Sequence, residues 1–205
     1  MIPLVENPSC CAVVVVDMQN DYCHPDGAMA RMGNDVTAAA RVLPNVVSLL
    51  ELARDHGVPC ILVRTTHGPW TDTHGWRSRG QGGDVLDLDQ TPLVAVGSWG
   101  AEFFEVEPRP EDLVVTKHRY SAFAFTPLEL ALHARERDMV LCAGTMTNAC
   151  VEATALDAVM RGFRAALISD CTATSSDEAQ RLGLTKFAAL IGPVIALATL
   201  RAAWQ

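Results

Sequence analysis

Short apolar runs alternate along this chain with longer segments in which apolar residues recur at helical spacing. The runs are typical of buried strands and lie at 11–16, 58–64, 113–116, 140–143, 163–169 and 194–197. The helical segments lie at 36–56, 126–137, 151–162 and 176–191, with a short tail helix at 199–204. Strands that alternate with helices indicate a parallel sheet with both faces covered. The sequence therefore predicts an α/β fold with a mostly parallel, doubly wound sheet of about six strands.

Local signals add detail to these helices. Pro44 interrupts the helix at 36–56, which should begin there or carry a kink. Pro127 fits the first position of its helix, and Ser176 is a plausible N-cap. The polar segment 18–34, which contains glycine and proline, is predicted to be a loop.

The chain is expected to form a single domain over residues 1–205, because no shift in composition divides it. Residues 65–112 are its least regular part and hold three of the four tryptophans. A stretch this long without periodicity is usually functional, disordered or an insertion. We interpret it as a lid or loop region.

The net charge and the arrangement of the cysteines limit which partners the protein can bind and in which cell compartment it is expected. A formal net charge of -8 argues against nucleic acid or an anionic membrane as a partner. No apolar run approaches the roughly 20 residues that span a bilayer, and residues 1–8 lack the basic start of a signal peptide. The seven cysteines are odd in number and dispersed, which is typical of reduced thiols. We expect a cytoplasmic protein.

The segment 139–162 carries the strongest chemical signal. Its apolar strand is broken at Gly144, and helical spacing resumes at Val151, with Thr147 or Asn148 as the expected N-cap. Cys150 then falls in the first helical turn, where free N–H groups and the helix dipole should lower its pKa. The hypothesis is that Cys150 is a nucleophile and that the turn before it is an oxyanion hole. The alternative, a buried inert thiol, requires an apolar setting that the neighbouring polar residues oppose.

Two further reactive side chains follow apolar strands. Asp17 comes directly after the first strand, and Lys117 ends the third. Alone, Asp17 could cap a turn and Lys117 could be a surface lysine with a buried stem. The carboxyl ends of parallel strands, however, meet at the ligand-binding edge of the sheet. There a lysine can stabilise a thiolate, and a carboxylate can move its proton.

At these positions the chain resembles the isochorismatase-like cysteine hydrolase family. The matching stretches are 13–21 (VVVVDMQND), 117–123 (KHRYSAF) and 144–152 (GTMTNACVE), in the family's order. The resemblance implies a three-layer αβα fold and a catalytic triad of Asp17, Lys117 and Cys150. It also implies a cis peptide bond between Thr145 and Met146, an oxyanion hole formed by the amides of Met146 and Cys150, and a homodimer or homotetramer.

The resemblance also separates possible reactions. Family members that cleave the vinyl ether of isochorismate lack a cysteine at the position of Cys150. Its presence implies hydrolysis of a C–N amide or ureide bond of a small molecule through a thioester. Asp17 would protonate the leaving ammonia or amine and then activate water. An isochorismatase-type hydrolase and a nicotinamidase-type hydrolase remain alternatives.

No cofactor or metal is expected. Nicotinamidases of the family bind a divalent ion through an Asp-x-His pair just after the second strand. Here that position reads Arg64-Thr65-Thr66-His67-Gly68, and Asp72-Thr73-His74 lies further along.

The substrate-binding residues are expected mainly in the irregular region. N-carbamoylsarcosine amidohydrolases hold a carboxylate with an arginine after the fifth strand, but 172–176 contain none. Local likeness is greatest to ureidoacrylate- and biuret-type amidohydrolases. Aromatic faces and guanidinium groups would clamp a planar or anionic amide; the candidates are Trp70, Trp76, Arg77, Arg79, Trp99, Tyr120 and Phe123. Alternatively, the tryptophans only pack a satellite core.

Two non-hydrolytic classes are also considered. A binding protein on the same fold would be expected to lack one triad residue, yet all three are present. A redox protein would pair Cys150 with Cys23 or Cys171, but no exchange motif surrounds them.

Overall fold

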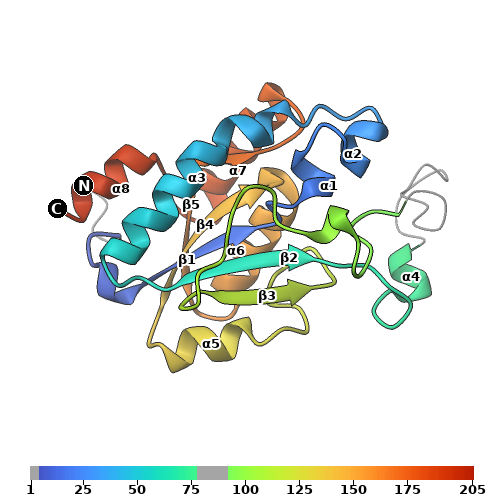
Figure 1. Cartoon of the computed structure of the whole chain (residues 1–205). Helices are drawn as coiled ribbons and strands as arrows, with labels where there is room; N and C mark the ends of the chain where they lie inside the picture. The colour runs from blue at the N-terminus through green and yellow to red at the C-terminus, as the bar shows by residue number, and fades with distance from the viewer. Residues whose placement is uncertain (1–4, 78–91) are drawn as a thin grey trace.

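The computed structural model describes residues 5–77 and 92–205. Its strands form one six-stranded, all-parallel sheet in the order β3-β2-β1-β4-β5-β6 (Figure 1). The strands are β1 (Cys11–Val16), β2 (Cys60–Thr65), β3 (Leu113–Lys117), β4 (Met139–Thr145), β5 (Arg164–Ala173) and β6 (Val194–Ile195). The expected α/β fold with a doubly wound parallel sheet is confirmed. The prediction of a single domain over the whole chain stays a prediction.

Helices cover both faces of the sheet. They are α1 (Asn20–Cys23), α2 (Ala28–Arg31), α3 (Thr37–Asp55), α4 (His74–Arg77), α5 (Leu128–Ala134), α6 (Glu152–Met160), α7 (Asp177–Leu190) and α8 (Leu197–Ala203). Helices α3 and α8 pack on one face, and α5, α6 and α7 pack on the other. The result is the three-layer αβα arrangement.

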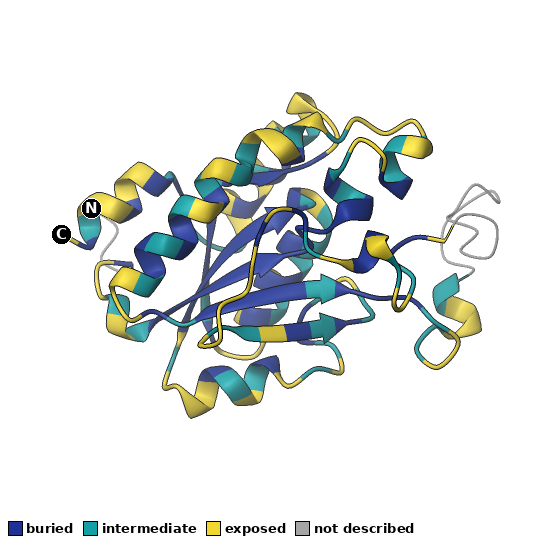
Figure 2. Cartoon of the chain, viewed as in Figure 1, coloured by how far each residue is buried: buried dark blue, intermediate teal, exposed yellow. Residues whose placement is uncertain are grey.

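The alternation of side chains along β1 shows why the strands are continuously apolar. Val13 and Val15 point into the core beneath α3 and α8, whereas Val14 and Val16 point into the core beneath α5, α6 and α7. Every residue of β1 is buried, as Figure 2 shows for the central strands. A strand with two covered faces needs an apolar residue at each position.

The predicted helices are present, with local differences. Helix α3 begins at Thr37 and continues through Pro44, rather than beginning there. Ser176 caps α7 by accepting a hydrogen bond from the amide of Ala179, as expected, whereas Pro127 precedes α5 as its N-cap residue. The prediction that 18–34 is only a loop is wrong, because the short helices α1 and α2 form there. Each has only four residues, too few to show a periodic pattern.

The strand order reverses at β1, and the segments that follow β1 and β4 lie at this point of the sheet edge. The chain moves outward from β1 through β2 to β3 and then returns to β4 on the other side of β1. Gly144 in β4 has φ +104° and pairs with Val16, so close that a Cβ would lie 2.0 Å from the Val16 carbonyl oxygen. Only glycine suits this position, and its close approach brings the segments after β1 and β4 together.

In the described part of the chain, no helix combines the length and apolar character required to cross a membrane.

Candidate active site

Three strand ends bring Asp17, Lys117 and Cys150 into contact. Asp17 follows β1 with φ 54°, Lys117 ends β3, and Cys150 lies in the π-helical turn after β4 (Thr147–Val151). Lys117 Nζ lies 2.8 Å from Asp17 Oδ2 and donates a hydrogen bond of 3.3 Å to Cys150 Sγ. The lysine is therefore the centre of the cluster and bridges the carboxylate and the thiol.

Thr65 at the end of β2 completes this arrangement. Strand β2 lies between β1 and β3, so Thr65 stands between the two charged residues. Its hydroxyl accepts a 2.6 Å hydrogen bond from Lys117 Nζ and donates a 2.9 Å hydrogen bond to Asp17 Oδ1. The sequence analysis missed Thr65, although its place as the last residue of a strand at the same sheet edge was an available signal.

Lys117 is a buried cation with four polar neighbours. Its exposed fraction is 0%, and beside Asp17, Thr65 and Cys150 its Nζ contacts the Arg119 carbonyl oxygen, to which it donates a hydrogen bond of 3.0 Å. Burial alone lowers the pKa of Lys117, but the charges of Asp17 and Cys150 outweigh it, so the pKa lies above the usual lysine value. Lys117 is therefore protonated at neutral pH.

The expectation of a lowered pKa for Cys150 is wrong. Burial is the largest cause and the charge of Asp17 adds to it, which together raise the pKa of the Cys150 thiol to about 12 despite Lys117. At neutral pH the resting group is therefore a thiol. A base must remove the thiol proton when the sulfur attacks. Asp17 is the carboxylate that interacts with Cys150, so it is the candidate for this base.

This raised pKa predicts slow alkylation of Cys150 at neutral pH. Only the thiolate reacts, and its fraction grows tenfold per pH unit below a pKa of about 12. The rate of modification by iodoacetamide, followed by peptide mass spectrometry, should still be rising at about pH 10. Asp17→Asn removes a charge that raises this pKa, so alkylation should become faster. A plateau near pH 7, or slower alkylation in Asp17→Asn, would contradict the assignment.

The turn that carries Cys150 differs from the expected N-cap geometry. Met146 is the N-cap residue, and neither Thr147 nor Asn148 caps the turn with its side chain. Thr147 Oγ1 instead donates to Gln180 Oε1 at 2.7 Å, and Asn148 Oδ1 accepts from Thr174 Oγ1 at 2.7 Å. These bonds tie the turn to α7 and to the end of β5. The preceding Thr145–Met146 peptide bond is cis, the form that the family resemblance implies.

A cavity of about 190 Å³ opens over the cysteine. Of the substrate-binding candidates, Trp76 and Tyr120 line it together with the three triad residues. Trp76 is half-buried, and its ring meets that of Tyr120 edge-on with centroids 5.0 Å apart.

The other candidates lie elsewhere or cannot be placed. Trp70 is 97% exposed, and Trp99 packs edge-on against His24. Arg77 lines a neighbouring pocket instead, and Phe123 is buried in the core against Phe163. None of these four side chains lines the cavity. For the three in the irregular region, the sequence has no periodicity to show which side chains point inward, and their role in substrate binding stays a prediction. Arg79 lies outside the described residues.

Several cavity residues were missed by the sequence analysis. They are Tyr22, Met29, Thr65, Leu93, Arg119 and Ala149. Arg119 lies in the stretch 117–123 that carries the family resemblance, two residues after Lys117. This position was a sequence signal for a cavity residue.

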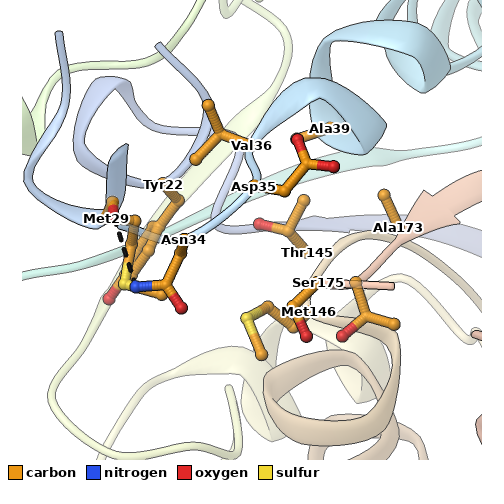
Figure 3. A pocket seen from close by; sticks show the side chains of 11 residues that line it. Tyr22, Met29, Asn34, Asp35, Val36, Ala39, Thr145, Met146, Ala173 and Ser175 are labelled. Atoms are coloured by element: carbon orange, nitrogen blue, oxygen red, sulfur yellow. Dashed lines mark hydrogen bonds between the residues drawn. The ribbon is translucent and has the colours of Figure 1, made fainter. Parts of the chain in front are cut away.

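A smaller pocket of about 20 Å³ shares Thr145 and Met146 with the cavity (Figure 3). Asp35, before α3, and Ser175, after β5, stand around it. The segment after the fifth strand thus reaches the site but brings no arginine, as the sequence indicated. An acidic side chain stands at this wall instead.

The residues considered for a metal pair with each other. His67 Nδ1 and Asp72 Oδ1 are 2.9 Å apart, and each side chain is 6% exposed. Across residues 5–77 and 92–205, no group of three or more His, Cys, Asp or Glu side chains could hold a metal ion. The donor set does not fit the nicotinamidase metal site, and metal-independent hydrolysis remains a prediction.

The chain is similar to known proteins over most of its length. The family model described as isochorismatase domain matches residues 11–199. Ureidoacrylate amidohydrolase RutB of Caulobacter vibrioides is 31% identical over 186 residues, which are 83% of this chain and 80% of that protein. A cysteine hydrolase structure from Pseudomonas syringae pv. phaseolicola 1448A has a TM-score of 0.84 and 32% identity, covering 96% of this chain and 93% of that one. N-carbamoylsarcosine amidase from Thermoplasma acidophilum has a TM-score of 0.72 and 26% identity, covering 91% and 96%. The chain belongs to the isochorismatase family.

Proposed function

We propose that this protein is a cysteine amidohydrolase that cleaves a C–N amide or ureide bond of a small molecule. The observation that carries the proposal is the contact of Lys117 Nζ with both Asp17 and Cys150 at the base of a cavity. This set holds a nucleophile, a base and a fixed positive charge within hydrogen-bond reach. The similarity to ureidoacrylate amidohydrolases and to N-carbamoylsarcosine amidase supports C–N bonds as the target.

The reaction begins with the neutral thiol of Cys150. Asp17 takes the thiol proton as sulfur attacks the substrate carbonyl, and the Lys117 ammonium stabilises the developing thiolate. The amides of Met146 and Cys150 donate to the oxyanion, a role that typically contributes about 10²–10³ in rate per donor. Collapse expels ammonia or an amine, which carries away the proton held by Asp17, and leaves a thioester.

Water completes the cycle. Asp17, again a carboxylate, removes a proton from the water that attacks the thioester. The proton then passes to the departing Cys150 sulfur, which restores the thiol. Thr65 fixes both Asp17 and Lys117 through its hydroxyl, so it is a positioning residue rather than a catalytic one.

A substrate screen tests this function. The purified protein is incubated with ureides, N-carbamoyl acids, nicotinamide and small aliphatic amides, and ammonia release is measured. We expect release from ureides or N-carbamoyl acids, undiminished by EDTA. Release from nicotinamide alone would favour the nicotinamidase alternative, and cleavage of isochorismate without amide hydrolysis would favour the ether-cleaving alternative.

The redox alternative has less support. Cys23 and Cys171 are buried in the core beneath α3 and α8, whereas Cys150 packs against the core on the opposite face of the sheet. All seven cysteines are free. Free thiols support our proposal of a cytoplasmic enzyme, and acidic composition supports the absence of nucleic acid and membrane partners. A homodimer or homotetramer remains part of the proposal.

A further inference from the structure

We propose that Arg119 is the specificity-determining residue of this site and binds a carboxylate, so that the substrate is an anionic ureide. The inference rests on the proposed function, since it names the substrate class of the same cavity. Arg119 lines the cavity two residues after Lys117. Its own carbonyl oxygen accepts a hydrogen bond from Lys117 Nζ, which couples its backbone to the triad.

The guanidinium group is held in one orientation. Nη1 donates to the carbonyl oxygens of Thr71 and His118 at 3.1 and 2.6 Å. Cζ lies over the Trp76 ring, 4.8 Å from its centroid. A guanidinium fixed through one nitrogen and stacked on an aromatic face keeps its other N–H groups for a ligand and loses little entropy on binding.

The charge of Arg119 has no carboxylate partner within the described residues. Among residues 5–77 and 92–205 it forms no ion pair with a carboxylate, while Asp17 is paired with Lys117 and Asp72 with His67. A half-buried cation on a mainly apolar cavity wall attracts an anion more strongly than the same group in water would. A planar carboxylate also matches the guanidinium fork.

The small pocket beside the cavity offers no competing cation. Asp35, Thr174 and Ser175 line it, and none of its lining residues is a lysine, arginine or histidine. In the cavity itself Lys117 is paired with Asp17, which leaves Arg119 as the cation for a substrate carboxylate.

Paired substrates test this inference. The probes are 3-ureidopropanoate and the neutral propylurea, which differ at the carboxylate. Arg119→Gln should raise KM for 3-ureidopropanoate about 100-fold, since a lost charged hydrogen bond costs about that much. Its effect on propylurea should be below about threefold, and Arg119→Lys should recover part of the difference.

Arg77→Gln is the matched control, because Arg77 lines the neighbouring pocket. We expect it to change KM for either probe by less than about twofold. Calorimetric titration of 3-ureidopropanoate into Cys150→Ala protein, with and without Arg119→Gln, gives the same comparison for binding alone.

The outcomes separate the two proposals. Equal effects of Arg119→Gln on both probes would assign Arg119 a structural role and overturn the inference while leaving the proposed function intact. A larger effect of Arg77→Gln would transfer the role to Arg77 and also overturn it. Hydrolysis of neutral ureides in preference to anionic ones would overturn it as well. If the wild-type protein hydrolyses no amide or ureide, the proposed function fails and the inference fails with it.

Discussion

Replacement of Cys150 by alanine is expected to abolish hydrolysis while the fold is retained. The nucleophile is lost, and no thioester can form, so kcat should fall by about 10⁴-fold or more. Lys117 loses only one of its partners, because Asp17, Thr65 and the Arg119 carbonyl oxygen remain in contact with it. Ammonia release measures the activity, and far-ultraviolet circular dichroism with thermal unfolding measures the fold.

Cys142→Ala is the matched control for this variant. Cys142 lies in β4, fully buried in the core beneath α5, α6 and α7. This change removes a buried sulfur outside the cavity and should leave kcat within about twofold of the wild-type value, at a modest cost in stability. Full activity in Cys150→Ala would refute the cysteine mechanism. Mass spectrometry of quenched reactions should show an acyl adduct on Cys150 in the wild type and in Cys142→Ala, and none in Cys150→Ala.

The sheet and the triad could be predicted from the sequence for one shared reason. A strand buried on two faces is apolar throughout, as at Cys11–Val16, so its ends are visible where polar residues resume. Asp17 follows the end of β1, the turn with Cys150 follows β4, and Lys117 is the last residue of the edge strand β3. A parallel sheet brings these ends to one edge. Here secondary structure alone specifies the neighbourhood.

The rest depends on tertiary packing that no local pattern carries. Trp70 and Trp76 lie in the same irregular segment, yet one is exposed and the other lines the cavity. The pKa of Cys150 is raised because burial and the charge of Asp17 outweigh Lys117, and this burial follows from the complete fold. Thr65 contacts Lys117, which is distant from it in the sequence, and Arg119 donates to the carbonyl oxygen of Thr71 in a loop. Neither contact is visible in a local sequence pattern.

Replacement of Lys117 by methionine is expected to remove both activity and stability. Asp17 is only 1% exposed and would lose the ammonium that pairs with it. Loss of one partner of a buried ion pair typically costs about 3–5 kcal/mol. Urea denaturation should show a decrease of this size in the free energy of unfolding, and kcat should become undetectable because the thiolate loses its stabilising charge.

A second substitution separates these two effects. In Asp17→Asn/Lys117→Met the buried carboxylate is replaced by a neutral amide, so most of the lost stability should return. Activity should not return, since the double variant has neither the base nor the cation. Asp17→Asn alone should be inactive, yet Lys117 should keep its contacts with Thr65 and with the Arg119 carbonyl oxygen.

If the double variant is no more stable than Lys117→Met, the lysine stabilises the fold through its packed stem rather than through its charge. Activity in any of the three variants would remove Asp17 or Lys117 from the catalytic step, because the geometry gives Cys150 no other described base or cation within hydrogen-bond reach.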